Sequence, residues 1–302
     1  MKFFYAALAV LVAQPSSMLA QKAPVARPPI TGIAQVFVYS SDMAKARHFY
    51  GEFLGFPESG RMHQRYRVNA KQWIQVDPLP PGVANHLESI AFATPNVEHM
   101  RIYLMDKGIQ VPDQVTVGKD GSRMLWLKDP EGHRIEFIQA AARERWTPAE
   151  KLEKPVSHNI LHAGFIVHDR AAENRFYRDV LGFRQAWQGG MKDNKTDWVD
   201  MQVPDGGEWI EYMVHGPQAA SANESGVLNH FSLGVVSVHK AQTLLEQRDW
   251  HPSGREKPQI GRDGKWQLNL YDPDGTRVEM MEFRPVRTPC CSPYTLPERT
   301  IE

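Results

Sequence analysis

The chain has 302 residues, which is enough for two domains of modest size, each with its own core. Lysine and arginine together number 35, aspartate and glutamate also number 35, and 42% of the residues are hydrophobic. This balance argues against a protein that binds nucleic acid or an anionic membrane through its overall charge. The composition is that of a folded chain rather than a disordered one.

The first twenty residues follow the order of a secretory signal peptide. A positive residue, Lys2, precedes an apolar stretch from Phe3 to Val12 that is too short to span a bilayer. Small residues follow, and we place cleavage near Ala20. An apolar N-terminal helix is the alternative interpretation. We therefore expect an exported protein, periplasmic or secreted, with no membrane association after residues 1–20 are removed.

An internal repeat organises the rest of the chain. The segment Asp42–Phe56 parallels Asp169–Phe183, and both contain Phe-Tyr followed by Leu-Gly-Phe. The segment Asp129–Phe137 parallels Asp272–Met280, and both begin with Asp-Pro. Shorter matches, such as Trp-Ile-Gln-Val and Trp-Ile-Glu-Tyr, occur in the same order in each half. The chain is therefore a tandem duplication.

Each half is itself predicted to contain two modules. In the first half, a strand at Gln35–Tyr39 precedes an N-cap at Asp42 and a helix that ends at Gly55. A second strand at Ser89–Ala93 precedes a helix at Val97–Lys107, and further strands follow each helix. The same order is predicted in the second half, at 162–167, 170–181, 230–236 and 238–248. The predicted fold is α+β, with two βαβββ modules in each half.

The segments outside the repeat are predicted to be connections. The expected organisation is a signal peptide at 1–20, a first domain at 31–140, a linker at 141–156, a second domain at 157–285 and a proline-rich tail at 286–302. The tail either wraps a surface or is disordered. Its neighbouring residues Cys290 and Cys291 would bridge each other only with strain. That leaves a surface thiol site, an intermolecular bridge or no role for this pair.

The helix motif and the Asp-Pro-x-Gly-x-x-x-Glu ending resemble the vicinal oxygen chelate superfamily over residues 31–140 and 157–284. That superfamily includes glyoxalase I, methylmalonyl-CoA epimerase, extradiol dioxygenases, and fosfomycin- and bleomycin-resistance proteins. The resemblance implies that two modules curl into a cup-like mixed sheet whose inward side chains hold a metal. It does not identify a reaction.

Four residues of the second half match the ligand positions of such proteins. His162 lies on the first strand of one module and His230 on the first strand of the next, while Glu211 and Glu279 lie on later strands. Two imidazoles and two carboxylates bind first-row divalent metals well. The resemblance therefore implies one divalent ion, Ni, Co, Zn, Mn or Fe, in the second domain. A single histidine at a strand start is more often a core or surface residue, but here all four positions carry ligand-type side chains.

The first half lacks both histidines. Its equivalent residues are Gln35, Gln75, Ser89 and Glu136, so we expect this half to be degenerate and to hold no metal. Modules of a four-module chain pair either within a half or across halves. Pairing across halves would bring Gln35 and Gln75 into one cup with His230 and Glu279. We favour pairing within each half, because it uses every strong ligand once.

Alternation along the strands predicts which other side chains face the cup. If Glu211 points inward, so do Trp209 and Met213. Likewise Gln267 and Asn269 would point inward and orient substrate, unless that strand simply faces water. The loop that carries Arg262, Asp263 and Lys265 would either cover the site or form a solvated turn. Five further histidines are expected on the surface or in loops: 158, 168, 215, 239 and 251.

The resemblance implies a metal-dependent lyase or isomerase that uses the ion as a Lewis acid on a small oxygen-bearing molecule. Glu279 is the first candidate for proton transfer and Glu211 the second. An extradiol dioxygenase is the first alternative, but Asn269 stands where such enzymes carry a tyrosine. A protein that sequesters a ligand without catalysis is the second alternative. A monomer or homodimer with a small-molecule substrate and no nucleic-acid partner is expected.

Overall fold

The computed structural model describes residues 24–59, 64–141, 154–248, 250–251 and 256–295. The predicted signal peptide and most of the predicted linker therefore lie outside the described residues. Among the helices of the described part, none has the length and apolar character needed to span a membrane.

The first half forms one eight-stranded mixed sheet with the order β2-β3-β4-β1-β5-β8-β7-β6. Its first module contains β1 (Gly32–Ser40), α1 (Met43–Arg47), the π-helix η1 (His48–Phe53), β2 (Glu58–Ser59), β3 (Gln64–Arg67) and β4 (Trp73–Pro78). Its second module contains β5 (Leu87–Ala93), α2 (Val97–Asp106), β6 (Thr116–Val117), β7 (Arg123–Lys128) and β8 (Arg134–Gln139).

The second half forms an equivalent sheet with the order β10-β11-β12-β9-β13-β16-β15-β14. Its first module contains β9 (Ile160–Val167), α3 (Arg170–Glu173), the π-helix η2 (Asn174–Val180), β10 (Arg184–Gly189), β11 (Trp198–Gln202) and β12 (Trp209–Val214). After α4 (Ala222–Leu228), the last module contains β13 (His230–Val235), α5 (Val238–Glu246), β14 (Gln259–Ile260), β15 (Trp266–Tyr271) and β16 (Arg277–Glu282).

These sheets confirm the α+β class and the two βαβββ modules in each half. They also confirm pairing within each half, because each sheet takes all its strands from one half. Two details of the helices differ from the prediction. The first helix of each half changes from α to π geometry after about one turn, at His48 and at Asn174. The short helix α4, with a capping box at Ser221 and Glu224, was not predicted.

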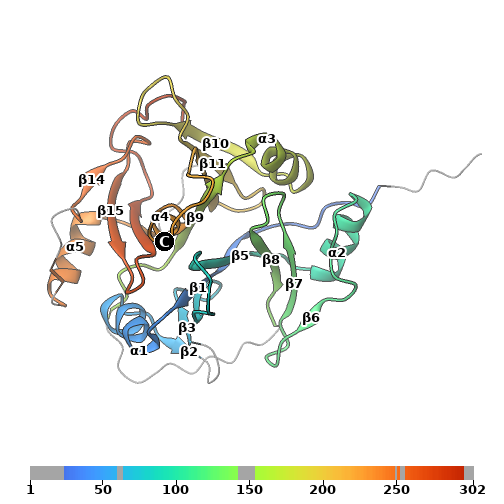
Figure 1. Ribbon diagram of the computed structural model, residues 1–302, viewed down its shortest axis with the longest axis horizontal. Coiled ribbons are helices and arrows are strands. Elements are labelled where there is room, and N and C mark those ends of the chain that lie inside the picture. Colours follow the sequence, from blue (N-terminus) through green and yellow to red (C-terminus); the bar gives the residue numbers. More distant parts are fainter. Residues whose placement is uncertain (1–23, 60–63, 142–153, 249, 252–255, 296–302) are drawn as a thin grey trace, which may run out of the picture.

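The two halves pack against each other through their helices, although no strand of one half joins the sheet of the other. In Figure 1, α1 of the first half lies beside the last module, and α3 lies beside β7 and β8 of the first half. Two buried hydrogen bonds fix this arrangement: Tyr50 Oη donates to Asp272 over 2.8 Å, and Tyr177 Oη donates to Asp129 over 3.1 Å. A single apolar core therefore runs through both halves.

Candidate metal centre

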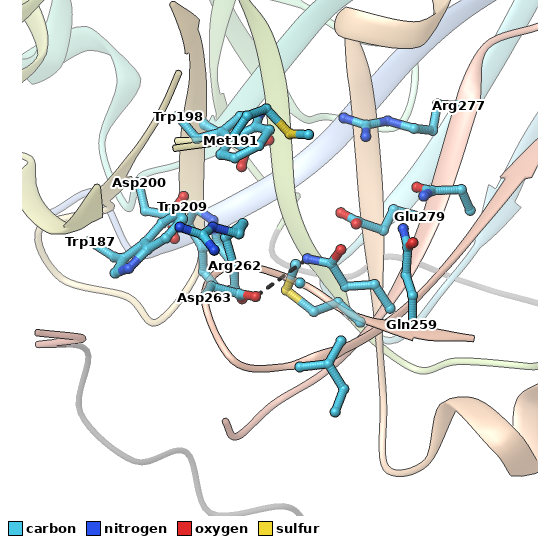
Figure 2. A pocket seen from close by; sticks show the side chains of 16 residues that line it. Trp187, Met191, Trp198, Asp200, Trp209, Gln259, Arg262, Asp263, Arg277 and Glu279 are labelled. Carbon is cyan, nitrogen blue, oxygen red and sulfur yellow. Dashed lines mark hydrogen bonds between the residues drawn. The ribbon is translucent and has the colours of Figure 1, made fainter. Parts of the chain in front are cut away.

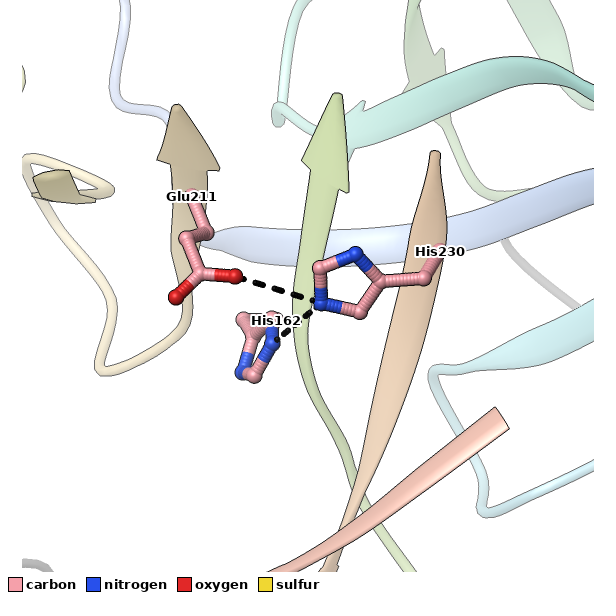
Figure 3. Close-up of side chains that lie close together, drawn as sticks. All are labelled: His162, Glu211 and His230. Carbon is pink, nitrogen blue, oxygen red and sulfur yellow. Dashed lines mark hydrogen bonds and ion pairs between the residues drawn. The ribbon is translucent and has the colours of Figure 1, made fainter. Parts of the chain in front are cut away.

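The four central strands of the second sheet carry the four predicted ligands. His162 lies on β9, Glu211 on β12, His230 on β13 and Glu279 on β16. These strands are neighbours in the order β12-β9-β13-β16, so residues far apart in sequence meet on one face. Figure 3 shows His162, Glu211 and His230 pointing toward one another from their separate strands.

The separations suit ligands of one shared ion. The two Nε2 atoms of His162 and His230 are 3.2 Å apart, Glu211 Oε2 lies 3.3 Å from His230 Nε2, and Glu279 Oε2 lies 3.3 Å from His162 Nε2. Nitrogen and oxygen ligands of a zinc-like ion bind at about 2.0–2.2 Å, which places adjacent ligand atoms about 3 Å apart. The residues present therefore fit a divalent metal.

The tautomer of His230 supports metal binding. Its Nδ1 lies 2.9 Å from the carbonyl oxygen of Leu228, and a carbonyl oxygen only accepts, so Nδ1 carries the proton. In the neutral ring, Nε2 then presents a lone pair to the centre of the site. Burial, together with the charge of Arg277, lowers the pKa of His230 and so favours this neutral form.

His162 is held by stacking instead. Its ring lies on the indole of Trp209 with centroids 5.0 Å apart, and its side chain has no exposed surface. Its Nδ1 is buried without a hydrogen-bond partner among the described residues. Its other nitrogen, Nε2, faces the centre of the site, 3.2 Å from His230 Nε2 and 3.3 Å from Glu279 Oε2.

Gly164 makes room for the His230 ring. The two residues are register partners on β9 and β13, and a Cβ atom built on Gly164 would lie 2.2 Å from His230 Cε1. No ordinary side chain fits there, because carbon atoms in contact lie about 3.5–4.0 Å apart. The glycine therefore lets the imidazole lean across the central strand toward Glu211.

Both carboxylates are ionised within this cluster. Burial raises the pKa of Glu279, but the hydrogen bond to His162 and the charge of Arg277 outweigh it and hold the value at about 2. Burial also raises the pKa of Glu211, but the hydrogen bond and charge that His230 offers when it is protonated outweigh burial, so this pKa too lies below its ordinary value. Ionised oxygens are the form that binds a divalent cation.

A cavity of about 320 Å³ opens above the two carboxylates (Figure 2). Glu211 and Glu279 line it, whereas both imidazoles lie fully buried behind them. Gln267 and Asn269 also line the cavity, as predicted from the alternation along β15. The intervening Leu268 and Leu270 lie in the core, so β15 does not simply face water.

Several lining residues were not predicted. They are Trp187, Met191, Trp198, Asp200, Gln259, Ile260, Arg277 and Met281. The clearest is Asp200, which is register partner to Glu211 and nearly buried. Burial and repulsion from Glu211 raise the pKa of Asp200 well above its ordinary value. Side chains two residues apart on a strand share a face, so Trp198 and Asp200 could both have been placed in the cup once β11 was known to be a strand.

The loop before β15 covers one side of the cavity and is not a solvated turn. Asp263 and Lys265 are buried, and Lys265 Nζ lies 4.4 Å from the centre of the Trp209 ring. Burial raises the pKa of Asp263, and the charge of Lys265 limits this rise, so the pKa is about 6. Arg262 lines the cavity, and its guanidinium is paired with Asp193. This loop is thus part of the wall of the cup.

The described part of the tail packs against the same wall. The indole Nε1 of Trp187 donates to Cys290 O over 3.0 Å, and Lys265 Nζ donates to the hydroxyl of Tyr294. Cys290 and Cys291 are joined to each other as a disulfide. The bond excludes the surface thiol site and the intermolecular bridge that were considered from sequence, and whether the pair has a role is not tested.

The equivalent positions of the first half are occupied by internal contacts. Ser89 Oγ donates to Glu136 Oε1 over 3.2 Å, and Arg134 Nη2 lies 3.0 Å from the same oxygen. The indole of Trp73 donates to Gln35, and Gln75 accepts from Arg65. These contacts use the polar atoms that would face an ion. That this half binds no metal stays a prediction.

The remaining histidines lie where they were expected. The five placed on the surface or in loops from sequence are all exposed: 158, 168, 215, 239 and 251. His86 is buried outside the ligand cluster. No prediction was made for His48, His99 and His133, and His133 belongs to a second, largely buried group with Asp129 and Glu173, at the contact between the two halves.

Comparison with known proteins places this architecture in a family. The model of the Glyoxalase/Bleomycin resistance protein/Dioxygenase superfamily matches residues 32–137 and 159–280. Similar solved structures include the Mn(II)-bound glyoxalase from Novosphingobium aromaticivorans, with 17% identity, a TM-score of 0.65 and coverage of 84% of this chain and 83% of that chain.

Two dioxygenases are also similar in fold. A variant of homoprotocatechuate 2,3-dioxygenase from Brevibacterium fuscum has 20% identity and a TM-score of 0.63, covering 86% of this chain and 74% of that chain. The 2,3-dioxygenase LapB from Pseudomonas sp. KL28 has 16% identity and a TM-score of 0.61, covering 87% and 97%. No curated protein sequence matches the chain. Since the family model matches both halves, the chain belongs to the Glyoxalase/Bleomycin resistance protein/Dioxygenase superfamily.

Proposed function

We propose that the protein is a metal-dependent lyase or isomerase of the glyoxalase kind. The observation that carries this proposal is the position of Glu211, whose Oε2 lies 3.3 Å from His230 Nε2. With Glu211, the donor set contains two imidazoles and two carboxylates, and both carboxylates line the cavity. A metal ion held by such a set would act as a Lewis acid, while one of its carboxylate ligands would accept a proton from the substrate.

The residues divide into ligands and proton carriers. His162, Glu211, His230 and Glu279 would hold one divalent ion, which would polarise a substrate oxygen and stabilise a neighbouring anion when bound. Glu279 and Glu211 are ionised and face the cavity, so each is in the form that accepts a proton. Glu211 is the more exposed, with 14% of its side chain accessible against 5% for Glu279.

The cavity suits a small substrate with an apolar body. Its volume of about 320 Å³ lies at the low end of the range for small-molecule sites. Trp187, Trp198 and Trp209 form apolar walls, while Arg277 adds a positive charge beside Glu279 (Figure 2). With the amides of Gln267 and Asn269, these groups would orient a compound that presents neighbouring oxygens.

The metal requirement is tested on native protein. Elemental analysis should give at least one ion per chain, and a chelator should abolish activity that single divalent metals restore. Activity that survives complete removal of metal would contradict the proposal. Screening should use small α-hydroxy and α-keto carbonyl compounds, because the proposed chemistry moves a proton between adjacent oxygen-bearing carbons.

Three isosteric variants then separate ligation from proton transfer. Glu279→Gln and Glu211→Gln keep an oxygen ligand but remove the proton acceptor, and the residue that carries the proton should lose about 10²–10⁴-fold in kcat. Glu282→Gln is the matched control on β16, because its carboxylate accepts from the Val238 N–H outside the cup. Equal kcat in all three variants would exclude carboxylate proton transfer.

An extradiol-type dioxygenase is the second candidate. His162, His230 and Glu279 alone form a two-histidine, one-carboxylate set of the kind that holds iron in oxygenases. Against it stand the additional carboxylate of Glu211 and the amide of Asn269 in place of a tyrosine. Oxygen uptake with catechols by the iron-loaded protein would favour this candidate. Ligand binding by a protein that carries no metal would favour a sequestering role.

We also propose that the protein is exported. The order of charged, apolar and small residues at 1–20 supports this proposal. N-terminal sequencing of protein from the native cell should find a chain that begins after about residue 20. A full-length cytosolic chain would contradict it.

A further inference from the structure

A second group of ligand-type side chains lies at the contact between the halves. Asp129 lies in the turn after β7, His133 precedes β8 by one residue, and Glu173 ends α3. One ligand atom from each lies within 4.8 Å of those of the other two. The group is remote in sequence from the four residues of the cup and shares none of them.

Each oxygen of Asp129 has two polar neighbours when no ion is bound. Its Oδ1 accepts from the N–H groups of Glu131 and His133, over 3.1 and 2.8 Å. Its Oδ2 accepts from the hydroxyl of Tyr177 and lies 2.8 Å from His133 Nδ1. The Phe165 ring packs on the imidazole with centroids 4.5 Å apart, so the histidine is fixed on two sides.

Glu173 is only half satisfied. Its Oε1 accepts from the N–H of Glu131 over 3.1 Å, but its Oε2 has no hydrogen-bond partner among the described residues. The residue has 0% of its surface exposed. Burial and the charge of Asp129 raise the pKa of Glu173 to about 9. Two buried carboxylates side by side need a positive partner, either a proton or a cation.

The repeat supplies an internal comparison for this group. At the equivalent contact, the Tyr50 hydroxyl donates to Asp272 over 2.8 Å, and Asp272 Oδ1 accepts from the N–H of Thr276 over 2.8 Å. The glutamate is replaced there by Ala46, which is fully buried, and the histidine is replaced by Thr276. The contact between halves therefore forms with a tyrosine and an aspartate alone. The glutamate and histidine are additions that the packing does not require.

We propose that Asp129, His133 and Glu173 form a second divalent-cation site, separate from the cup, that joins the two halves. One imidazole and two carboxylates suit Zn²⁺ or a similar first-row ion. The bound cation gives Glu173 Oε2 the partner it lacks and neutralises the two carboxylates. His133 has 22% of its side chain exposed and lines a surface pocket, which gives an ion a route in from solvent.

The test compares the number of zinc ions bound by the wild-type chain and by a variant that carries, at positions 173 and 133, the residues found at the equivalent positions 46 and 276. Wild-type protein, stripped with chelator and dialysed against Zn²⁺, should retain two ions per chain. The double variant Glu173→Ala with His133→Thr should retain one. Both replacements occur at the equivalent positions of the same fold, so the variant is expected to fold. Its Tm without metal, measured in parallel, checks this.

Glu131→Gln provides the matched control, since it alters a carboxylate of the same turn. The Glu131 carboxylate accepts from the N–H groups of His168 and Asp169 rather than facing the cluster, so this variant should retain both ions. Zinc at a hundredfold excess over Kd should also raise the wild-type Tm by about 5 °C more than that of the double variant. Equal stoichiometry in wild type and double variant would overturn the proposal and leave a buried proton at Glu173.

Discussion

The substitution Gly164→Ala tests whether the cup depends on room for one imidazole. The added Cβ would lie 2.2 Å from Cε1, 2.7 Å from Nδ1 and 3.1 Å from Nε2 of His230. Since carbon contacts are ordinarily about 3.5 Å or more, the ring must retreat by more than about 1 Å. Metal sites tolerate displacements of about 0.5 Å. We therefore expect metal affinity to fall at least 10–100-fold, or about 1.4–2.7 kcal/mol.

Metal affinity would be measured by competition with a chelating dye, and stability by urea unfolding of the metal-free protein. Gly234→Ala is the control, because its Cβ on β13 would lie 2.5 Å from Phe283 Cε1, away from the ligands. Each variant should lose about 1–3 kcal/mol of unfolding free energy through overpacking. Only Gly164→Ala should lose metal. If both variants keep the wild-type affinity for metal, the absence of a side chain at Gly164 is not what lets His230 reach the metal site.

Three further predictions concern stability and the wall of the cup. Asp205 Oδ2 accepts from Arg27 Nη1 over 2.8 Å, and such bonds outweigh burial and lower the pKa of Asp205. The stabilisation from ionised Asp205 is fully present above 3.8, the pKa in the unfolded chain, and is lost as the pH falls through the lower pKa of the folded protein. Asp205→Asn should therefore lower the free energy of urea unfolding by less than about 1 kcal/mol at pH 7, and by less still at pH 2. A difference that stays constant over that range would contradict the assignment. Tyr294→Ala should expose Lys265 and the neighbouring Trp209 to water and shift tryptophan emission to longer wavelength, whereas Tyr294→Phe should leave the emission unchanged. Identical spectra for both variants would mean that the tail does not shield this part of the cavity wall from water. Finally, a chelator should lower the Tm, because the buried ligands lose their common partner, and an unchanged Tm would count against metal in the native protein.

The sequence predicted the parts of the fold that follow from local periodicity and from the repeat. With Glu211 placed in the cup by the resemblance, alternation along β12 and β15 put Trp209, Gln267 and Asn269 on the same inner face, and all three line the cavity; Met213, predicted to do the same, does not line it. This worked because a strand has only two faces and its core side chains identify one of them. The positions of His162 and His230 came from the resemblance to the ligand positions of the superfamily, because the first half has Gln35 and Ser89 there.

Features that depend on contacts between distant segments were not predictable in this way. The packing of the tail on Trp187 and Lys265 joins residues about a hundred and about thirty positions away. Trp198 and Asp200 lie on a five-residue strand whose register is set by its neighbours rather than by its own pattern. The crossed packing of the helices has no local signature, because a buried tyrosine looks the same whichever half supplies its aspartate.

The glycine beside His230 also bears on how the two halves diverged. The first-half counterpart of Gly164 is Phe37, which is register partner to Ser89, the counterpart of His230. A histidine returned to position 89 would therefore meet a phenyl ring where the working cup has open space. A metal site in the first half would therefore need Phe37→Gly as well as the missing histidines. Introducing single ligands there would not create a site as long as the Phe37 ring occupies the space that Gly164 leaves open in the second half.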